Sequence, residues 1–74
     1  MEAIAVDSTS LATIAYDADR KILQIGFRDQ KIYQYLSVPS EVHEELLSAP
    51  SKGSFFNRQI RGRYAHHRVQ RSLS

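Results

Sequence analysis

The chain has 74 residues and a mass of 8.5 kDa, which suits one small domain and excludes a multidomain enzyme or a large doubly wound sheet. It contains no cysteine, which excludes a disulfide framework and a thiolate zinc site and fits a reducing compartment. Hydrophobic residues make up 42% of the sequence, so disorder is not the default, and no apolar run approaches the roughly 20 residues of a membrane span. We therefore expect a soluble, cytoplasmic domain with a thin core.

The net charge of +2 conceals an uneven distribution of charge along the chain. Residues 1–50 hold four basic and eight acidic residues (4 − 8 = −4), whereas residues 51–74 hold six basic residues and no acid (+6). Clustered Lys and Arg are typical of surfaces that bind polyanions such as nucleic acids. The same residues also fit a solubilising tail, or ion pairs back to Glu41, Glu44 and Glu45.

The first half of the chain predicts an antiparallel sheet. Residues 1–9 show no clear hydrophobic period, and we expect them to form a loose lead-in. Residues 10–16, 21–27 and 32–36 alternate apolar and polar side chains and are separated by polar turns. These patterns predict three strands joined by two hairpins.

The first hairpin is expected to bring two apolar faces together. Ala12, Ile14 and Tyr16 share one face of the first strand. Pairing Tyr16 with Lys21 across the turn places Ile14 opposite Leu23, so that the apolar faces of the two strands coincide.

The second hairpin admits two registers. A two-residue turn directs Tyr33 and Tyr35 to the face opposite the apolar residues of the preceding strand. A three-residue loop with a bulge at Gln30 instead pairs Ile25 with Tyr33 and Leu23 with Tyr35. We favour the second register because it groups the large side chains on one face and buries no glutamine without a partner.

Two helices are predicted after the strands. Pro39 suits the first turn of one helix, which ends at Pro50, and Ser51 can cap a second helix that runs to about Arg61. Residues 65–74 have no apolar face, and we expect a basic flexible tail. The apolar faces of the helices are formed by Val42, Leu46 and Ala49 in the first and by Phe55, Phe56 and Ile60 in the second.

The expected fold class is therefore α+β. A three-stranded antiparallel meander is followed by two short helices packed on one sheet face, with the domain spanning residues 10–64.

Short motifs along the chain resemble a known family. They are Ser10-Leu11, Tyr16-Asp17, Leu23-x-Ile25-x-Phe27, Tyr33-Gln34-Tyr35, Val38-Pro39, Ala49-Pro50-Ser51-x-Gly53 and Phe55-Phe56-Asn57-x-x-Ile60-Arg61. In this order and at these spacings, residues 8–64 resemble the KTSC domain. That family is named for its place at the C-terminus of some lysyl-tRNA synthetases and also occurs as small stand-alone bacterial proteins.

The resemblance implies RNA binding, which is the role proposed for the family. One position departs from the family pattern, since Gln30 stands in the second turn where glycine is common. Glycine adopts a positive φ angle more easily than other residues, by about 1 kcal/mol.

Basic and aromatic residues are the candidates for contact with nucleic acid. Arg58 and Arg61 are three residues apart on a helix and share a side, and their guanidinium groups match phosphate oxygens. Tyr33 and Tyr35 either stack unpaired bases or fill the edge of the core with their hydroxyls in water, and the favoured register supports the core. The candidate nucleic-acid-binding residues are Lys52, Arg58, Arg61, Arg63, Arg68, Tyr33 and Tyr35.

Other chemistry finds little support in the sequence. His66 and His67 are adjacent and lack acidic neighbours, so we expect no metal site and no cofactor. No serine lies in a nucleophile elbow, and no glycine-rich loop is present to hold a phosphate, so we expect no enzyme.

The leading hypothesis is a small non-catalytic accessory module that binds RNA, such as tRNA. The alternative is a protein-interaction module that pairs with a protein partner, or with a second copy, through the open edge of the first or third strand. We expect no membrane partner.

Overall fold

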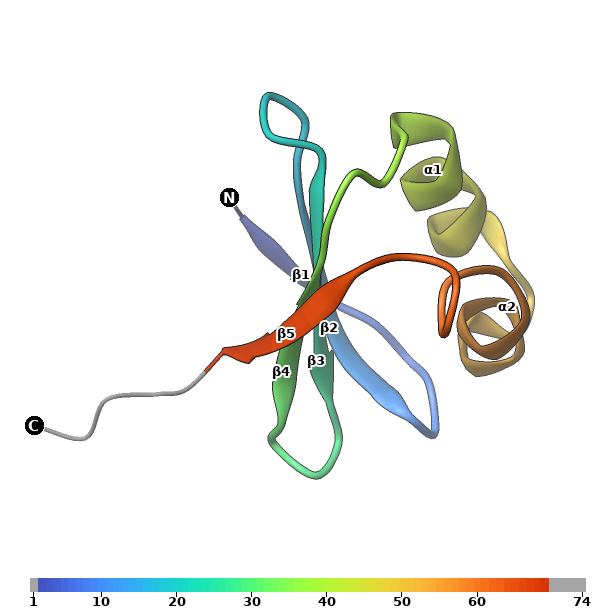
Figure 1. Cartoon of the computed structure of the whole chain (residues 1–74). Helices are drawn as coiled ribbons and strands as arrows, with labels where there is room; N and C mark the ends of the chain where they lie inside the picture. The colour runs from blue at the N-terminus through green and yellow to red at the C-terminus, as the bar shows by residue number, and fades with distance from the viewer. Residues whose placement is uncertain (1, 70–74) are drawn as a thin grey trace, which may run out of the picture.

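Two helices cover one face of a five-stranded antiparallel sheet in the computed structural model, which describes residues 2–69 (Figure 1). Each strand pairs with the next along the chain, and both helices lie between the fourth and fifth strands in sequence. No helix within residues 2–69 has the length and apolar character needed to cross a membrane. The elements are β1 (Ala3–Ala5), β2 (Leu11–Asp17), β3 (Ile22–Phe27), β4 (Ile32–Tyr35), α1 (Ser40–Ser48), α2 (Lys52–Gln59) and β5 (His66–Val69).

The α+β class with two helices on one sheet face is confirmed, but the prediction of three strands is wrong. Strand β1 arises within the expected lead-in, and β5 arises within the expected tail, of which residues 70–74 lie outside the described part. Most side chains of these two strands are exposed, so neither segment carries the apolar alternation that marks a half-buried strand. Consequently β2 and β4 are interior strands, and β1 and β5 form the edges of the sheet.

The register of the first hairpin differs from the prediction by two residues. Tyr16 lies opposite Leu23 rather than Lys21, and Ile14 lies opposite Ile25. Lys21 has a φ angle of 56°, so it belongs to the turn and cannot extend the strand. Because the shift is an even number of residues, the two apolar faces still coincide.

A bulge changes which residue of β2 enters the core. The pairing with β3 is irregular between Leu11 and Thr13. Leu11 has no exposed surface, whereas Ala12, which was predicted to share the apolar face, is only partly buried. The extra residue in the bulge reverses the alternation at the start of the strand, which a period-two pattern cannot reveal.

The second hairpin has the three-residue loop that we favoured. Tyr33 lies opposite Ile25, and Tyr35 follows on the same face. Gln30 has a φ angle of 73°, and its backbone N–H donates a hydrogen bond to the carbonyl of Phe27 at 2.9 Å. This geometry matches a tight turn followed by a left-handed residue. Both tyrosines therefore face the helices.

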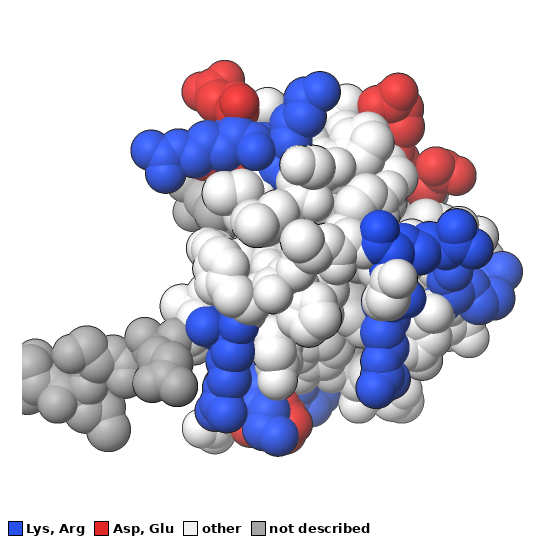
Figure 2. All heavy atoms as spheres, in the orientation of Figure 1, with Lys and Arg blue, Asp and Glu red and all other residues white. Residues whose placement is uncertain are grey.

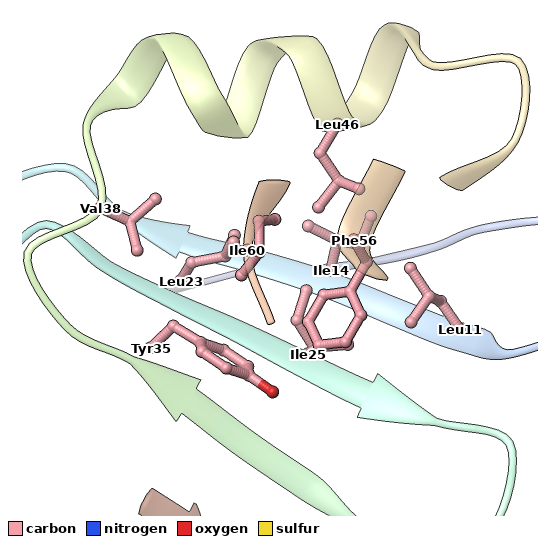
Figure 3. Close-up of a cluster of buried hydrophobic side chains, with 9 residues drawn as sticks. All are labelled: Leu11, Ile14, Leu23, Ile25, Tyr35, Val38, Leu46, Phe56 and Ile60. Carbon is pink, nitrogen blue, oxygen red and sulfur yellow. The ribbon is translucent and has the colours of Figure 1, made fainter. Parts of the chain in front are cut away.

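The core lies between the sheet and the helices. Figure 3 shows side chains from β2, β3, β4, α1 and α2 pointing toward one another. Burying one aliphatic side chain of this size stabilises the folded state by about 1.5–3 kcal/mol. The core cluster consists of Leu11, Ile14, Leu23, Ile25, Tyr35, Val38, Leu46, Phe56 and Ile60.

Helix α2 begins where the sequence predicted. The hydroxyl of Ser51 accepts a hydrogen bond from the backbone N–H of Ser54 at 3.3 Å, which satisfies a free donor of the first turn. The helix ends at Gln59, two residues before the predicted end, with Ile60 as its C-cap.

A tyrosine on β2 fixes the position of α1. The Tyr16 hydroxyl donates a hydrogen bond to the carbonyl of Val38, just before the helix. The Tyr16 ring stacks on His43 with a centroid separation of 4.6 Å and an interplanar angle of 14°. Burial lowers the pKa of His43, an effect that the negative charge of Glu44 opposes.

Replacing Gln30 with glycine should stabilise the domain. Gln30→Gly removes the cost of a positive φ angle, so we expect the free energy of unfolding to rise by about 0.5–1 kcal/mol in urea denaturation. The control is Lys31→Gly at the next position, where φ is not positive. The free energy of unfolding of this variant should not rise above that of the original chain. A Gln30→Gly variant no more stable than the original chain would show that the turn is not strained.

Burial of His43 under the Tyr16 ring should make the free energy of unfolding depend on pH. Because folding lowers the pKa of His43, its contribution is complete above about pH 6.5 and is lost as the pH falls through the lower folded value. His43→Phe keeps an aromatic ring and should lose this dependence. Urea midpoints of both proteins at about pH 7.5 and pH 5 test this, because their difference cancels the other titrating groups. Parallel pH profiles would contradict the assignment.

Candidate functional site

A cleft of about 450 Å³ opens between the sheet and α2. Its aromatic lining comes from three elements: Phe27 ends β3, Tyr33 and Tyr35 lie on β4, and Phe56 lies on α2. Phe27 contacts Tyr33 and Phe56 edge to face, with ring centroids 5.9 and 5.3 Å apart. Tyr35 contacts Phe56 in the same manner at 5.4 Å. The rings hold one another in place and form an apolar surface inside the cleft.

The beginning of α2 forms one wall of the cleft. Gly53 lies against the start of β2, where an added Cβ would be 3.4 Å from the Ser10 hydroxyl oxygen. Asn57 follows four residues later and therefore lies on the same side of the helix. Ser10, Gly53 and Asn57 all line the cleft. Because Gly53 has no side chain, the helix adds no atoms beyond its backbone to the cleft at this position.

Strand β5 supplies the opposite wall. Gly62, with a φ angle of 77°, reverses the chain after α2, and the Leu36 N–H donates to the Ala65 carbonyl at 2.8 Å. The His66 ring then stacks on Tyr35, with centroids 5.2 Å apart and an interplanar angle of 28°. His66 also contacts Tyr33 edge to face at 5.9 Å.

Charged groups lie at both ends of the cleft. At the β3–β4 turn, the Lys31 ammonium lies 3.8 Å from a carboxylate oxygen of Asp29. At the other end, Arg61 lines the cleft near Tyr35. Burial and the neighbouring Tyr33 raise the pKa of Tyr35, while the charge of Arg61 acts in the opposite direction. Tyr35 is therefore an uncharged phenol at neutral pH.

The surface around the cleft is mostly basic. Figure 2 shows Lys and Arg side chains near α2 and near the β3–β4 turn, with an uncharged surface between them. Most of the acidic side chains visible in this view lie near α1 and the β2–β3 turn. The separation is partial, because Lys and Arg side chains also lie beside acidic ones at the β2–β3 turn and near the β3–β4 turn.

The structure brings together four of the predicted nucleic-acid-binding residues. Tyr33, Tyr35 and Arg61 line the cleft. Arg68 lies opposite Tyr33 in the pairing of β4 with β5, so it occupies the same sheet face beside the cleft. Tyr35 is only 4% exposed, which agrees with the core interpretation, whereas Tyr33 is half-buried.

The other predicted basic residues lie away from the cleft. The Lys52 ammonium donates to the Ala49 carbonyl at 3.2 Å, at the end of α1. The Arg63 Nε donates to the Arg58 carbonyl at 3.0 Å, at the end of α2. Arg58 lines a separate groove between the helices, together with Glu45. Lys52 and Arg63 therefore have structural partners.

The alternative of ion pairs between the basic helix and the acids of α1 is not found. Within residues 2–69, the pair formed by Lys31 and Asp29 is the one salt bridge. The same residues contain no cluster of three side chains suited to bind a metal ion.

Sequence reasoning missed part of the cleft. Lys31 was not singled out because its relevance depends on the turn geometry. His66 was considered as a metal ligand, and its place in the cleft was missed because β5 was not expected. Asn57 stood within a quoted motif, yet its place in the cleft depends on how α2 packs against the sheet, which the predicted helix start at Ser51 does not give.

Comparison with known proteins identifies the family. A family model described as the KTSC domain matches residues 7–64. The chain belongs to the KTSC domain family.

The fold agrees with a solved KTSC structure. The crystal structure of a KTSC domain protein from Yersinia pestis superimposes with a TM-score of 0.91 at 39% identity, covering 93% of this chain and 97% of that one. Among curated sequences, a protein of Stutzerimonas stutzeri is 40% identical over 57 residues, or 77% of this chain and 80% of its own length. The lysine–tRNA ligase of Nostoc punctiforme is 34% identical over 58 residues, covering 78% of this chain but only 10% of the ligase.

Part of the KTSC motifs of this sequence lines the cleft. Ser10, Phe27, the two tyrosines of β4 and four residues of the segment 53–61 belong both to the quoted motifs and to the cleft lining. Only Asp29, Lys31 and His66 line the cleft without belonging to those motifs. These are 8 of the 21 quoted motif residues, and several of the others, such as Leu23, Ile25 and Ile60, form the core.

The influence of Arg61 on Tyr35 can be tested by titration. Removing the positive charge with Arg61→Gln should raise the pKa of the Tyr35 phenol further above its ordinary value. The ¹³Cζ shift of Tyr35 followed by NMR through alkaline pH measures this change. Arg58→Gln removes the same charge from the other groove and should leave Tyr35 unaffected. An equal response to both variants would place Arg61 away from the hydroxyl.

Proposed function

We propose that this chain is a small, non-catalytic RNA-binding module of the cytoplasm that holds RNA against the cleft between the sheet and α2. The observation that carries the proposal is an aromatic cleft with cationic residues at its ends. Lys31 and Arg61 line it, and Arg68 lies beside it on β5.

The cations suit a phosphate backbone. Guanidinium groups present forked donors that match phosphate oxygens, and such charge-assisted hydrogen bonds are about twice as strong as neutral ones. Arg61 and Arg68 make no ion pair within residues 2–69, so both charges are available to a ligand. Binding of this kind releases counterions and weakens steeply as salt rises.

The aromatic surface favours unpaired bases over duplex. Proteins recognise single-stranded RNA largely by stacking its bases on aromatic side chains, at about 1–3 kcal/mol per base. Tyr33 is half-buried and retains surface in the cleft, whereas Tyr35 is covered by His66 and Phe56. Tyr33 is therefore the ring that we assign to a base.

The relatives support an RNA partner that is tRNA-like. Matching segments occur in lysine–tRNA ligases, whose name states that they act on tRNA, and each match covers about a tenth of the ligase. A binding module attached to such an enzyme would add affinity for its RNA through effective concentration.

The non-catalytic assignment rests on the chemistry of the cleft. Asp29, the one carboxylate among its lining residues, is paired with Lys31. No serine or threonine hydroxyl within residues 2–69 is hydrogen-bonded to a histidine, the arrangement that serine–histidine hydrolases use.

A second candidate function is protein interaction at the sheet edges. Strands β1 and β5 expose backbone donors and acceptors, so a partner protein or a second copy can add a strand to either edge. The sequence assigned this role to the first and third predicted strands, which correspond to β2 and β4. Both are interior strands, so that assignment was wrong and the free edges are β1 and β5. A partner retained in a pull-down after nuclease treatment, or a dimer in sedimentation, would favour this function over RNA binding.

The RNA proposal predicts a specific loss in one arginine variant. Arg61→Ala should weaken binding of tRNA or a short single-stranded RNA about tenfold, since it removes one charge-assisted contact. Fluorescence anisotropy at about 50 and 200 mM salt should also show a slope of log affinity against log salt that is smaller by about one.

Arg20→Ala is the matched control for this experiment. Arg20 is exposed in the β2–β3 turn, outside the cleft lining, and its loss changes the net charge equally. Equal effects of both variants would mean that the cleft contributes no more than net charge. Undetectable binding of either RNA at the lower salt would reject the proposal.

A further inference from the structure

The dimensions of the cleft suit one nucleotide. A cavity of about 450 Å³ lies within the range of sites that bind small organic ligands, roughly 300–1,000 Å³. Resting on the proposed RNA binding, we infer that the cleft recognises a single unpaired nucleotide, with its base on Tyr33 and its 5′ and 3′ phosphates at the two cationic ends.

The positions of the cations define two ends. Lys31 immediately precedes β4 and lines the cleft from the side of the β3–β4 turn, whereas Arg61 follows the C-cap of α2 and lines it from the helix side. Tyr33 lies on β4 between Lys31 and Tyr35 and lines the cleft with both cations. An aromatic surface flanked by two positive charges matches a nucleoside that carries a phosphate on each side.

The two ends are not equivalent. The carboxylate of Asp29 lies 3.8 Å from the Lys31 ammonium and reduces its attraction for an anion. Arg61 has no such acidic partner within residues 2–69. We therefore assign the stronger phosphate contact to Arg61 and the weaker one to Lys31.

Asn57 is placed to contact the edge of the base. Its side chain lines the cleft from α2, is exposed, and makes no hydrogen bond to another described residue. A carboxamide both donates and accepts hydrogen bonds, which is the pairing that base edges require. In a duplex these edges are occupied by the complementary base, so Asn57 adds a further preference for an unpaired nucleotide.

Gly53 leaves space in the cleft next to Asn57. It lies one turn before Asn57, and a side chain there would project toward Ser10 across the cleft wall. The absence of a side chain at Gly53 allows the ribose or phosphate of a bound nucleotide to approach the helix backbone closely.

The test uses small probes in place of RNA. Nucleoside 3′,5′-bisphosphates, the corresponding nucleosides and inorganic phosphate are titrated into ¹⁵N-labelled protein and followed by NMR. We expect the bisphosphates to bind at least tenfold more tightly than either the nucleosides or phosphate. Their largest shifts should fall at Tyr33, Asn57 and Arg61.

A pair of variants on α2 isolates base recognition. Asn57→Ala should weaken bisphosphate binding at least fivefold without changing the affinity for phosphate alone. Gln59→Ala removes an exposed carboxamide from the same helix outside the cleft and should change neither. Both substitutions place alanine in an exposed helix, where it is the most favourable residue, so both proteins should remain folded.

The possible failures are distinguishable. If RNA binds and depends on Arg61, but bisphosphates bind no better than phosphate, the one-nucleotide site is rejected and the RNA proposal stands. The same conclusion follows if Asn57→Ala and Gln59→Ala behave alike. If neither RNA nor the bisphosphates bind, both proposals fail.

Discussion

The register between β3 and β4 determines what this small domain can do. A slip of one residue would turn every side chain of β4 to the other face of the sheet and remove both tyrosines from the helices. Gln30 sets that register because it accepts a left-handed conformation and adds one residue to the loop. A modest local strain at Gln30 thereby places Tyr33 and Tyr35 on the sheet face that the helices cover, where α2 forms the second wall of the cleft.

That second wall comes from the position of the helices along the chain. Both helices are inserted between two neighbouring strands, and β5 then returns to pair with β4. Helix α2 packs beside the sheet, and the segment after it leads back to the sheet as β5 (Figure 1). Residues of α2, β3, β4 and β5 all line the cleft, so its residues are scattered from Ser10 to His66.

The sequence predicted the parts of the fold that are governed by local rules. The Ser51 cap and the choice between two registers of the second hairpin depend on neighbouring residues, and the structure confirms both. Strand alternation failed at the start of β2, where a bulge puts Leu11 in the core in place of Ala12. The edge strands were missed because Ala3–Ala5 and His66–Val69 bury little, and their pairing is set by backbone groups of adjacent strands. The same omission concealed His66 as a wall of the cleft. The side chains of Lys52 and Arg63 donate to carbonyl groups at helix ends, which composition alone cannot show.

Strand β5 belongs to the cleft and to the sheet edge at once. Its His66 side chain covers Tyr35, while its outer backbone groups have no neighbouring strand. A four-residue edge strand opens at a lower free-energy cost than the interior of a sheet, so β5 can separate without global unfolding. A nucleotide in the cleft, as proposed above, and a partner strand added to this edge would both stabilise the closed position of β5. Thermodynamic linkage then predicts that each would strengthen the binding of the other.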